Sequence, residues 1–463
     1  MAFFFCTNVR ILLYTIQLSV SKSLPTFCKI GTISFHTLTN RVLSCHTFRY
    51  TEIFLYVSTV QVAFFINLVY YISMIIREKW LKKIRPFYES ELVKVIIGIR
   101  RCGKSVVLKQ IYDEIHTDSE HKIYINFEDL QFASITNETE LYKHIKNLIT
   151  DEKKYYLFFD EIQNIKDFEK AINSFRLLKT SIFITGSNAK LLSGELATLL
   201  SGRYVSFRIQ PFSFAESLEI QHIMQADNNA FMDYIRWGGM PQRFALKTDD
   251  ELRVFLSDLY DSIVLKDIVS RYKIQNIDLL NRIVAYLSLN MSQIFSGTSI
   301  VNFLKSEKRD CSKESLYNYI SYIANSCIIN RVARYDIQGK KILSTLEKFY
   351  LADISFARLH AQKIDIGASI ENIVYNELLS RGYDVTVGVL PNKEIDFIAQ
   401  KGTEKEYYQV CYLLASDETV EREFGVYSSV KDNYPKYVLS LDDFDFSQNG
   451  IIHKNVIKWL LGA

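Results

Sequence analysis

A glycine-rich stretch contains the residues best suited to chemistry. The apolar run Val93–Ile97 leads into Gly98, four residues follow, and Gly103-Lys104-Ser105 opens a helix-compatible segment. Glycines let backbone N–H groups curl around an anion, and the start of a helix points its positive end at the same anion. A lysine and a hydroxyl at the end of such a loop can bind phosphate oxygens and Mg²⁺. The stretch therefore predicts a nucleotide-binding P-loop.

Each residue of this loop has an expected role. Lys104 is expected to reach the β- and γ-phosphates, and Ser105 to offer its hydroxyl to Mg²⁺. Arg100 and Arg101 are expected to be structural or to lie at the edge of the phosphates. The helix end could lower the pKa of Cys102, although a small residue that fills the loop is the favoured interpretation. The predicted nucleotide-binding set is Gly98, Ile99, Arg100, Arg101, Cys102, Gly103, Lys104, Ser105 and Val106.

A second apolar run, Tyr155–Glu161, ends in two adjacent carboxylates. A buried strand that stops at an acidic turn is common, but its distance from the P-loop favours the Walker B pattern. Asp160 is then expected to hold Mg²⁺, and Glu161 to orient and polarise the attacking water. The adjacent glutamate indicates hydrolysis by water rather than transfer to a bound acceptor.

Two further polar positions are candidates for contact with the γ-phosphate, one after a predicted strand and one before the next. Ser181–Thr185 predicts a strand, and Asn188, or Ser187 beside it, is expected to sense the γ-phosphate or the water. The alternative is that Asn188 caps the next helix. Arg203 precedes the strand Tyr204–Ile209 and is the candidate arginine for transition-state charge, acting in the same chain or across an oligomer interface. A solvated surface arginine competes with that interpretation.

These segments predict an α/β fold for residues 74–225, with helices on both faces of a five-stranded parallel sheet. His121–Phe127 supplies another strand, and helices are expected near Glu138–Thr150 and Asp167–Lys179. The strand Ser181–Thr185 should lie between the P-loop strand and the Walker B strand. The site is expected at the carboxyl ends of the strands, as in other open α/β sheets.

Composition limits the possible partners and the compartment. The 463 residues suggest about three domains. Of the net charge of +3, residues 1–73 carry +4, which leaves −1 for the other 390 residues. The body therefore lacks an overall basic footprint for nucleic acid, although a local basic patch is compatible with it. The cysteines follow no CxxC or zinc spacing, which fits a cytoplasmic protein.

Residues 1–73 leave three interpretations open. Residues 53–76 hold no formal charge and are long enough to span a bilayer. The acid-poor residues 1–50 are also compatible with a targeting segment. The favoured interpretation is a dispensable or mis-started extension, because Met74 opens a sensible amphipathic lead-in to the P-loop strand.

Together these motifs resemble a known family, the prokaryotic AAA-type ATP-binding proteins with a C-terminal restriction-endonuclease-like domain of unknown function. The resemblance runs from about Met74 to the end and does not cover residues 1–73. It implies ATP binding and points to ATP hydrolysis. The matching segments are Lys83–Leu108, Ile125–Asp129, Phe158–Asn164, Ile184–Phe207, Pro211–Glu216, Gly238–Pro241, Glu347–Asp353, Glu371-Asn372, Glu394–Phe397 and Tyr407–Tyr412.

Residues 226–355 predict helices followed by a hairpin, an arrangement typical of a winged helix. The helical patterns are Glu251–Tyr272, Asp278–Leu289, Thr298–Lys305 and Ser312–Ala324, and the hairpin strands are Ile328–Asp336 and Leu346–Tyr350. Basic residues that precede or open the last helix could contact a DNA backbone; they are Lys305, Lys308, Arg309 and Lys313. A helical lid packed on the ATPase domain is favoured instead, because Glu307, Asp310 and Glu314 interrupt the positive charge.

Residues 356–463 predict an α+β domain that resembles the restriction-endonuclease core. Glu371 lies near the start of the helix Ser369–Arg381, and Asp396 and Gln409 lie on successive strands. Cys411 stands where such nucleases place a lysine that acts on the water. Lys401 or Lys405 could supply that lysine from elsewhere. The favoured interpretation is a vestigial nuclease site in a fold retained for binding or scaffolding.

The sequence thus predicts a Mg²⁺-dependent ATPase that couples ATP hydrolysis to movement of its C-terminal domains. One alternative is a slow nucleotide switch that controls a protein or DNA partner. The other is an ATP-gated DNA nuclease. A homo-oligomer is compatible with each of these hypotheses. A membrane partner is compatible with them only if residues 53–76 are a genuine transmembrane span.

Overall fold

The computed structural model describes residues 75–192, 200–361 and 363–462. The interpretations given above for residues 1–73 concern a part of the chain outside these ranges. The predicted span 53–76 also lies outside them, apart from its last two residues. Within the described ranges, no helix is both long and apolar enough to cross a bilayer.

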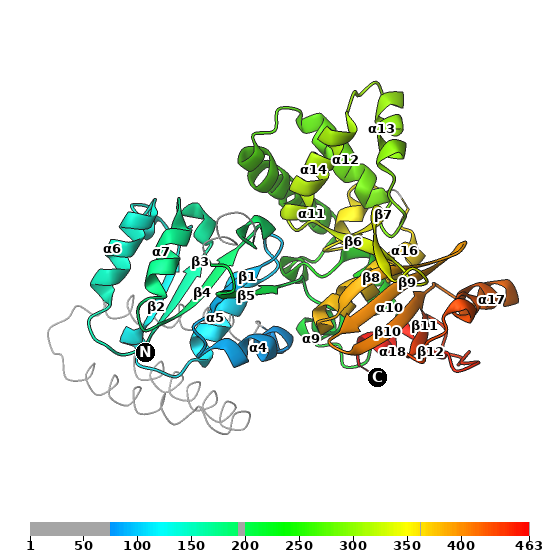
Figure 1. Cartoon of the computed structure of the whole chain (residues 1–463), viewed down its shortest axis with the longest axis horizontal. Coiled ribbons are helices and arrows are strands. Elements are labelled where there is room, and N and C mark those ends of the chain that lie inside the picture. The colour runs from blue at the N-terminus through cyan, green and yellow to red at the C-terminus, as the bar shows by residue number, and fades with distance from the viewer. Residues whose placement is uncertain (1–74, 193–199, 362, 463) are drawn as a thin grey trace, which may run out of the picture. The chain divides into compact units, whose positions relative to one another are not determined.

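The predicted five-stranded parallel sheet is confirmed, with the strand order β2-β3-β4-β1-β5. The strands are β1 (Val93–Ile97), β2 (Lys122–Asn126), β3 (Tyr155–Asp160), β4 (Thr180–Gly186) and β5 (Tyr204–Arg208). Every residue of β1, β3 and β4 is buried, as expected for the central strands of a parallel sheet covered on both faces. As predicted, β4 lies between the P-loop strand and the Walker B strand (Figure 1).

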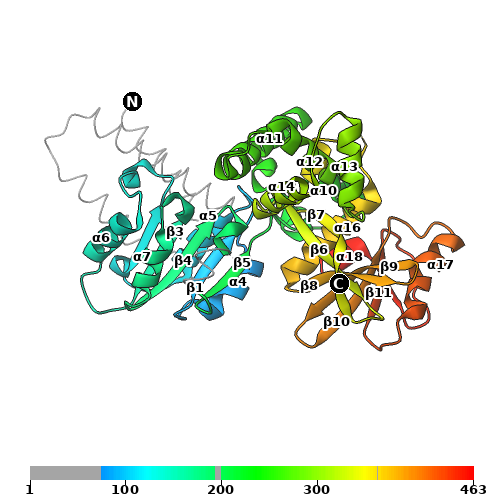
Figure 2. The same cartoon turned by 45° about the horizontal axis from the view of Figure 1, so that its top comes forward.

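Helices cover both faces of this sheet (Figures 1 and 2). Alternate side chains of β1 enter different cores: Ile96 packs with α5, whereas Val95 and Ile97 pack with the helices of the opposite face. The first face carries α4 (Glu78–Ile84) and α5 (Lys104–Glu114), and the second carries α6 (Glu138–Leu148) and α7 (Phe168–Phe175).

A helical region follows the ATPase sheet. Its helices are α9 (Phe214–Ile220), α10 (Asn228–Trp237), α11 (Asp249–Ser262), α12 (Ile277–Leu289), α13 (Gly297–Ser306), α14 (Lys313–Asn325) and α15 (Ser355–Arg358). The helix predicted over Glu251–Tyr272 is divided, because α11 passes into a π-helical segment, η7 (Ile263–Ser270). Arg309, one of the basic residues considered for DNA contact, forms ion pairs with Asp278 and Glu307.

A second sheet has seven strands in the order β12-β11-β10-β9-β8-β6-β7. The strands are β6 (Ile329–Asp336), β7 (Lys341–Leu351), β8 (Asp384–Leu390), β9 (Lys393–Lys401), β10 (Glu404–Val410), β11 (Lys436–Ser440) and β12 (Ile452–Asn455). The predicted hairpin is present as β6 and β7, but β6 also pairs in parallel with β8. This hairpin extends the C-terminal sheet, so the sheet crosses the domain boundary predicted at residue 355, and a winged helix is not established.

Helices lie on both faces of the C-terminal sheet. One face packs against α16 (Ile366–Arg381) and α18 (Val456–Leu460), and the other against α17 (Asp417–Gly425) and η8 (Val426–Ser429). Gly382 ends α16 with a φ of 89°, a left-handed conformation that favours glycine.

Candidate nucleotide-binding site

The P-loop connects β1 to α5, and two glycines give it its shape. Gly98 has a φ of 155° and Gly103 a φ of 99°. A Cβ atom on Gly98 would lie 2.3 Å from the carbonyl oxygen of Ile209, so only glycine fits between the loop and the chain after β5. The loop therefore folds closely against its own sheet and presents the start of α5 at the sheet's carboxyl edge.

Lys104 lies at the first turn of α5, and its side chain is 3% exposed. Its Nζ donates a hydrogen bond to the carbonyl oxygen of Ile99 at 3.1 Å, and it lies 3.9 Å from Oε1 of Glu161. Ser105, next in the chain, is exposed. The structure thus brings the predicted phosphate lysine and the predicted water-activating glutamate together.

Asp160, at the end of β3, is held by two hydroxyls that the sequence analysis missed. Thr185 Oγ1 donates to Asp160 Oδ1, and the hydroxyl of Tyr124 donates to Oδ2 at 3.2 Å. Burial, and next the neighbouring Asp160, raise the pKa of Tyr124, so this hydroxyl keeps its proton. The backbone N–H of Glu161 donates to the same Thr185 hydroxyl at 2.9 Å. The sequence did carry a signal for Thr185, because it is the polar last residue of the mostly apolar predicted strand Ser181–Thr185.

Glu161 has a left-handed backbone, with a φ of 53°. Such a conformation is uncommon for a residue other than glycine, and it is often found at functional sites. Its Oε2 accepts a hydrogen bond from Nε2 of Gln163, which the sequence analysis did not single out. Glu161 is therefore oriented by Gln163 on one side and by Lys104 on the other.

The two candidate sensors follow β4 and lie beside the P-loop. Gly186 pairs in register with Ile97, so Ser187 and Asn188 leave the sheet next to the start of the loop. Both side chains are fully buried. Ser187 Oγ donates to Asp267 Oδ1 at 3.3 Å. This position fits contact with a bound nucleotide, whereas the exact sensor assignment stays a prediction.

Asp267, on the π-helical segment η7, joins the P-loop to the helical region. Its carboxylate accepts hydrogen bonds from Arg100, from Nε at 3.0 Å and from Nη2 at 3.1 Å. These hydrogen bonds raise the pKa of Arg100. Arg101 donates to Gln242 at 2.7 Å. The sequence carries no local signal for Asp267, because it lies 167 residues from Arg100.

Cys102 is fully buried beneath the loop. Its thiol donates weakly to the carbonyl oxygen of Ile209 at 3.5 Å, and burial raises its pKa. The suggestion that the helix end lowers this pKa is therefore wrong, because desolvation outweighs the nearby positive charges. The favoured interpretation, a small residue that fills the loop, agrees with this packing.

Arg203 is not brought to the P-loop of its own chain. Its carbonyl oxygen accepts a hydrogen bond from the N–H of Val93, the first residue of β1. The P-loop follows the other end of this five-residue strand, roughly 16 Å away. Arg203 is exposed at the amino edge of the sheet. Its action across an oligomer interface stays a prediction.

The side chains at the carboxyl edge fit a magnesium ion. Asp160 and Ser105 supply a carboxylate and a hydroxyl, and Mg²⁺ in nucleotide enzymes takes one or two carboxylates together with phosphate oxygens and waters. Over the described residues, no group of three or more His, Cys, Asp or Glu side chains could hold a metal. A magnesium site here would therefore need the nucleotide's phosphates as further ligands.

The C-terminal sheet contains a second cluster of a lysine with carboxylates. Lys348, on β7, is 5% exposed; its Nζ lies 2.6 Å from Glu394, 3.2 Å from Glu371 and 3.7 Å from Asp396. Burial alone lowers the pKa of Lys348, but the three carboxylates raise it, and the net shift is upward. The lysine in this cluster is therefore Lys348, which the sequence analysis did not consider.

The two lysines that we considered for this cluster bind elsewhere. Lys401 donates to the carbonyl oxygen of Arg381 at 3.3 Å, and Lys405 lies 3.6 Å from Asp432. Cys411 is buried, and burial raises the pKa of its thiol.

The other two residues of the predicted nuclease site also meet in this cluster. Gln409 Oε1 accepts a hydrogen bond from the backbone N–H of Asp396 at 3.3 Å. Asp396 Oδ2 accepts one from the N–H of Val410 at 2.8 Å. Burial, and next the neighbouring Glu371, raise the pKa of Asp396 well above its usual value. The structure therefore brings Glu371, Asp396 and Gln409 together around a lysine rather than around an open site.

Comparison with known proteins agrees with the ATPase geometry. Residues 90–218 match the family model of an AAA domain, and residues 228–365 match a domain of unknown function (DUF8612). A protein of Haemophilus influenzae, described as uncharacterized, is 36% identical over 402 residues, which cover 84% of this chain and 99% of that protein. The chain belongs to the same family as this protein. A second member, uncharacterized protein MJ1544 of Methanocaldococcus jannaschii, is 32% identical and covers 73% of this chain and 79% of its own length.

This chain therefore carries an AAA-type P-loop ATPase domain. Among solved structures, the Walker-type ATPase PABY2304 of Pyrococcus abyssi aligns with 62% of this chain and 96% of its own, at 15% identity and a TM-score of 0.41.

Proposed function

We propose that this protein is a Mg²⁺-dependent ATPase. The observation that carries the proposal is the meeting of Lys104 and Glu161, 3.9 Å apart, at the carboxyl edge of the sheet. A phosphate-binding lysine and a carboxylate able to act on water are the two groups that hydrolysis of a γ-phosphate needs closest to the bond that breaks.

The residues divide the work as follows. The N–H groups of the loop and Lys104 bind the β- and γ-phosphates, so positive charge faces the bond that breaks. Glu161 accepts a hydrogen bond from the attacking water and takes its proton as the water adds. Ser105 and Asp160 would hold Mg²⁺, which when bound offsets the negative charge of the phosphates. Thr185 and Tyr124 keep Asp160 oriented.

Two further roles complete the proposed active site. Asn188, with Ser187 beside it, contacts the γ-phosphate or the water, supported by its burial next to the start of the P-loop. Arg203 acts across an oligomer interface, because its edge of the sheet is remote from the nucleotide of its own chain. This role requires a homo-oligomer.

The C-terminal sheet is proposed to be a restriction-endonuclease-like core without nuclease activity. The order α16-β8-β9-β10-α17-β11, with three antiparallel strands and a fourth parallel to the third, supports such a core. Lys348 bound by three carboxylates argues against nuclease activity, because its ammonium group fills the place where a metal would be needed. ATP hydrolysis would then move this domain, with DNA or a protein as the partner.

The proposal is tested with the full chain by measuring ATP binding and phosphate release, with Mg²⁺ and after chelation with EDTA. We expect phosphate release with Mg²⁺ and none with EDTA. A chain that binds no nucleotide, or that hydrolyses ATP equally well in EDTA, contradicts it.

A further inference from the structure

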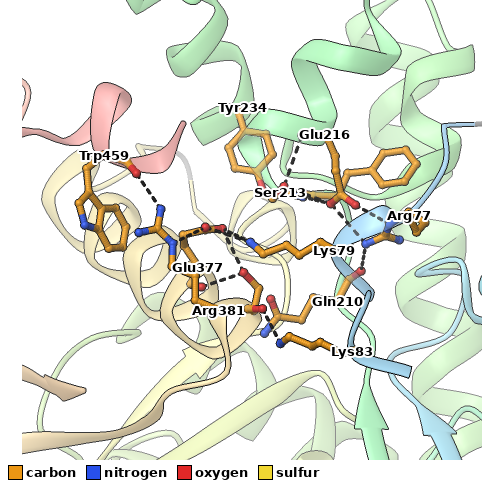
Figure 3. A network of polar contacts seen from close by, with 12 residues as sticks. Arg77, Lys79, Lys83, Gln210, Ser213, Glu216, Tyr234, Glu377, Arg381 and Trp459 are labelled. Atoms are coloured by element: carbon orange, nitrogen blue, oxygen red, sulfur yellow. Dashed lines mark hydrogen bonds and ion pairs between the residues drawn. The ribbon is translucent and has the colours of Figure 1, made fainter. Parts of the chain in front are cut away.

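Arg77, the residue before α4, is a buried arginine with an unusual set of partners. Its side chain is 1% exposed, and it donates to one carboxylate and two carbonyl oxygens (Figure 3). Nε lies 2.6 Å from Glu216 Oε1, Nη2 donates to Gln210 O at 2.9 Å, and Nη1 donates to Cys102 O at 3.1 Å. A buried charge is costly unless it is paired and hydrogen-bonded, so this arginine is fixed in position.

The contact with Cys102 acts directly on the nucleotide loop. The carbonyl of Cys102 and the N–H of Gly103 belong to one planar trans peptide and point in opposite directions. A guanidinium that holds the oxygen therefore turns the N–H away from itself. Arg77 Nη1 would lie 3.2 Å from a Cβ atom on Gly103, so the arginine supports the loop closely from one side. The N–H just before Lys104 is thus aimed before any phosphate arrives.

Arg77 is itself held by residues from three segments of the chain. Glu216 accepts from Arg77 and also forms a capping box with Ser213 at the start of α9. The Arg77 guanidinium lies 4.9 Å from the ring centroid of Phe212. Its backbone N–H donates to Gln110, on the helix that the P-loop opens, at 3.1 Å. The support of the loop is therefore rigid rather than one flexible side chain.

Helix α4, which begins directly after Arg77, also contacts the C-terminal domain. Lys79 and Lys83 are four residues apart and share one face of α4. Lys79 Nζ lies 2.9 Å from both carboxylate oxygens of Glu377, and Lys83 Nζ donates to Ser380 O at 2.6 Å (Figure 3). Burial lowers the pKa of Lys83 to about 8.

Glu377, on α16, is fixed in turn. It also pairs with Arg381 at 2.7 Å, and Arg381 donates to the carbonyl oxygen of Trp459 on α18 at 2.7 Å. A single residue, Glu78, thus separates the arginine that holds the P-loop from a lysine bound to the C-terminal domain.

We propose that Arg77 is a positioning residue that holds the P-loop in its phosphate-binding shape, and that the pair Lys79–Glu377 makes this support depend on the C-terminal domain. This inference rests on the proposed function and names a route by which the C-terminal domain regulates the nucleotide site.

The first test measures the affinity of the full chain for fluorescent ATP and ADP analogues. Arg77→Met should weaken both affinities by about tenfold or more, because a charge-assisted hydrogen bond to the loop is lost. Arg77→Lys should recover part of the loss. The matched control is Arg85→Met, at an exposed arginine eight residues along that pairs with Glu78 and Glu114; it should stay within about twofold of wild type.

The second test does not depend on the folding of the Arg77 variant. Lys79→Met and Glu377→Gln should each weaken ATP affinity by about threefold, and the double variant by no more than the stronger single change. If Lys79→Met, Glu377→Gln and the double variant all bind ATP as wild type does, this inference is overturned while the proposed function stands. A correctly folded Arg77→Met protein with wild-type affinity overturns it equally. If wild type itself binds no nucleotide, the proposed function falls and takes this inference with it.

Discussion

Lys104 in the ATPase domain and Lys348 in the C-terminal sheet are both buried beside carboxylates, but they differ in how firmly the carboxylates hold them. Lys104 lies 3.9 Å from a single glutamate and otherwise donates to a backbone carbonyl. Lys348 lies between 2.6 and 3.7 Å from three carboxylates. Lys104 can turn to a phosphate without leaving a charge cluster behind it. Moving Lys348 would instead take a cation from the buried Asp396 and from the half-buried Glu371 and Glu394.

The difference shows how similar residues serve different purposes. Lys104 follows a glycine that has a φ of 99°, so the backbone around it can wrap an anion. Lys348 lies on the edge strand β7, where it is opposite Val332 of β6 and forms an isolated bridge with Ile294, so its position is set by backbone pairing. A lysine on a glycine loop suits ligand binding, whereas a lysine on a strand among carboxylates suits structural stability.

The largest effect is expected from removing the lysine of the nucleotide site, Lys104. Lys104→Ala should reduce ATP turnover by about a hundredfold or more, because the phosphates lose their principal cation. The control is Lys109→Ala, one turn along α5 at a half-exposed lysine that pairs with Asp113; its turnover should stay near that of wild type. Steady-state phosphate release measures both. Normal turnover by Lys104→Ala would remove this lysine from the mechanism.

Lys348→Met should act on stability and leave ATP affinity within about twofold. Removing the cation leaves the buried Asp396 and the half-buried Glu371 without their charge partner, which costs about 3–5 kcal/mol of unfolding free energy. Urea unfolding of the full chain measures the loss, with Lys401→Met as an exposed lysine control that should change little. A Lys348→Met protein as stable as wild type would mean that the three carboxylates need no cation.

Asp267→Asn tests whether the P-loop depends on the π-helical segment. Asn offers one acceptor oxygen and one NH₂ donor, so the change keeps one of the two hydrogen bonds to Arg100 and sets an N–H group against the other donor. Unfolding free energy should therefore fall by about 1.5–3 kcal/mol. Asp261→Asn, an exposed aspartate one segment earlier, should alter stability by less than about 0.5 kcal/mol. Equal urea midpoints for both variants would contradict the importance of this contact.

Lys94 extends the comparison to a buried lysine bound by neutral oxygens. It donates to Ser90 O at 3.0 Å and to Ser181 Oγ at 2.8 Å, and burial, then the charge of Lys154, lower its pKa to about 7. The unfolded chain binds more protons at this residue between about pH 7 and its ordinary pKa of about 10.4, so stability should rise with pH there.

The contribution of Lys94 is at most about 1.4 kcal/mol per pH unit. Lys94→Met should flatten the rise in unfolding free energy between pH 7 and 9, and Lys82→Met, at an exposed lysine, should keep it. Identical slopes for wild type and Lys94→Met would show that Lys94 keeps its usual pKa in the folded protein.

Much of the ATPase domain could be predicted from local patterns. Buried parallel strands are continuous apolar runs, and the P-loop and Walker B residues follow such runs. The place of β4 between β1 and β3, and the proximity of Lys104 to Glu161, could therefore be predicted from the sequence. The position of Arg203 at the amino edge of the sheet could also be predicted, because a residue that precedes a strand of a parallel sheet lies at the end opposite the carboxyl edge.

The contacts that the sequence could not reveal join distant segments. Asp267 reaches Arg100 from a π-helical segment, and no nearby residue marks it. Lys348 belongs to a hairpin that was assigned to another domain, so its proximity to Asp396 could not be foreseen. Such pairings depend on tertiary packing rather than on local spacing.

The central claim, that the nucleotide site hydrolyses ATP through Glu161, is tested most directly by Glu161→Gln in the full chain. We expect this variant to bind ATP about as tightly as wild type and to release phosphate at least about a hundredfold more slowly. Glu152→Gln, before the amino end of the same strand, is the matched control and should turn over normally. Equal turnover by Glu161→Gln and wild type would contradict the claim, and tight binding without turnover by wild type would favour a nucleotide switch.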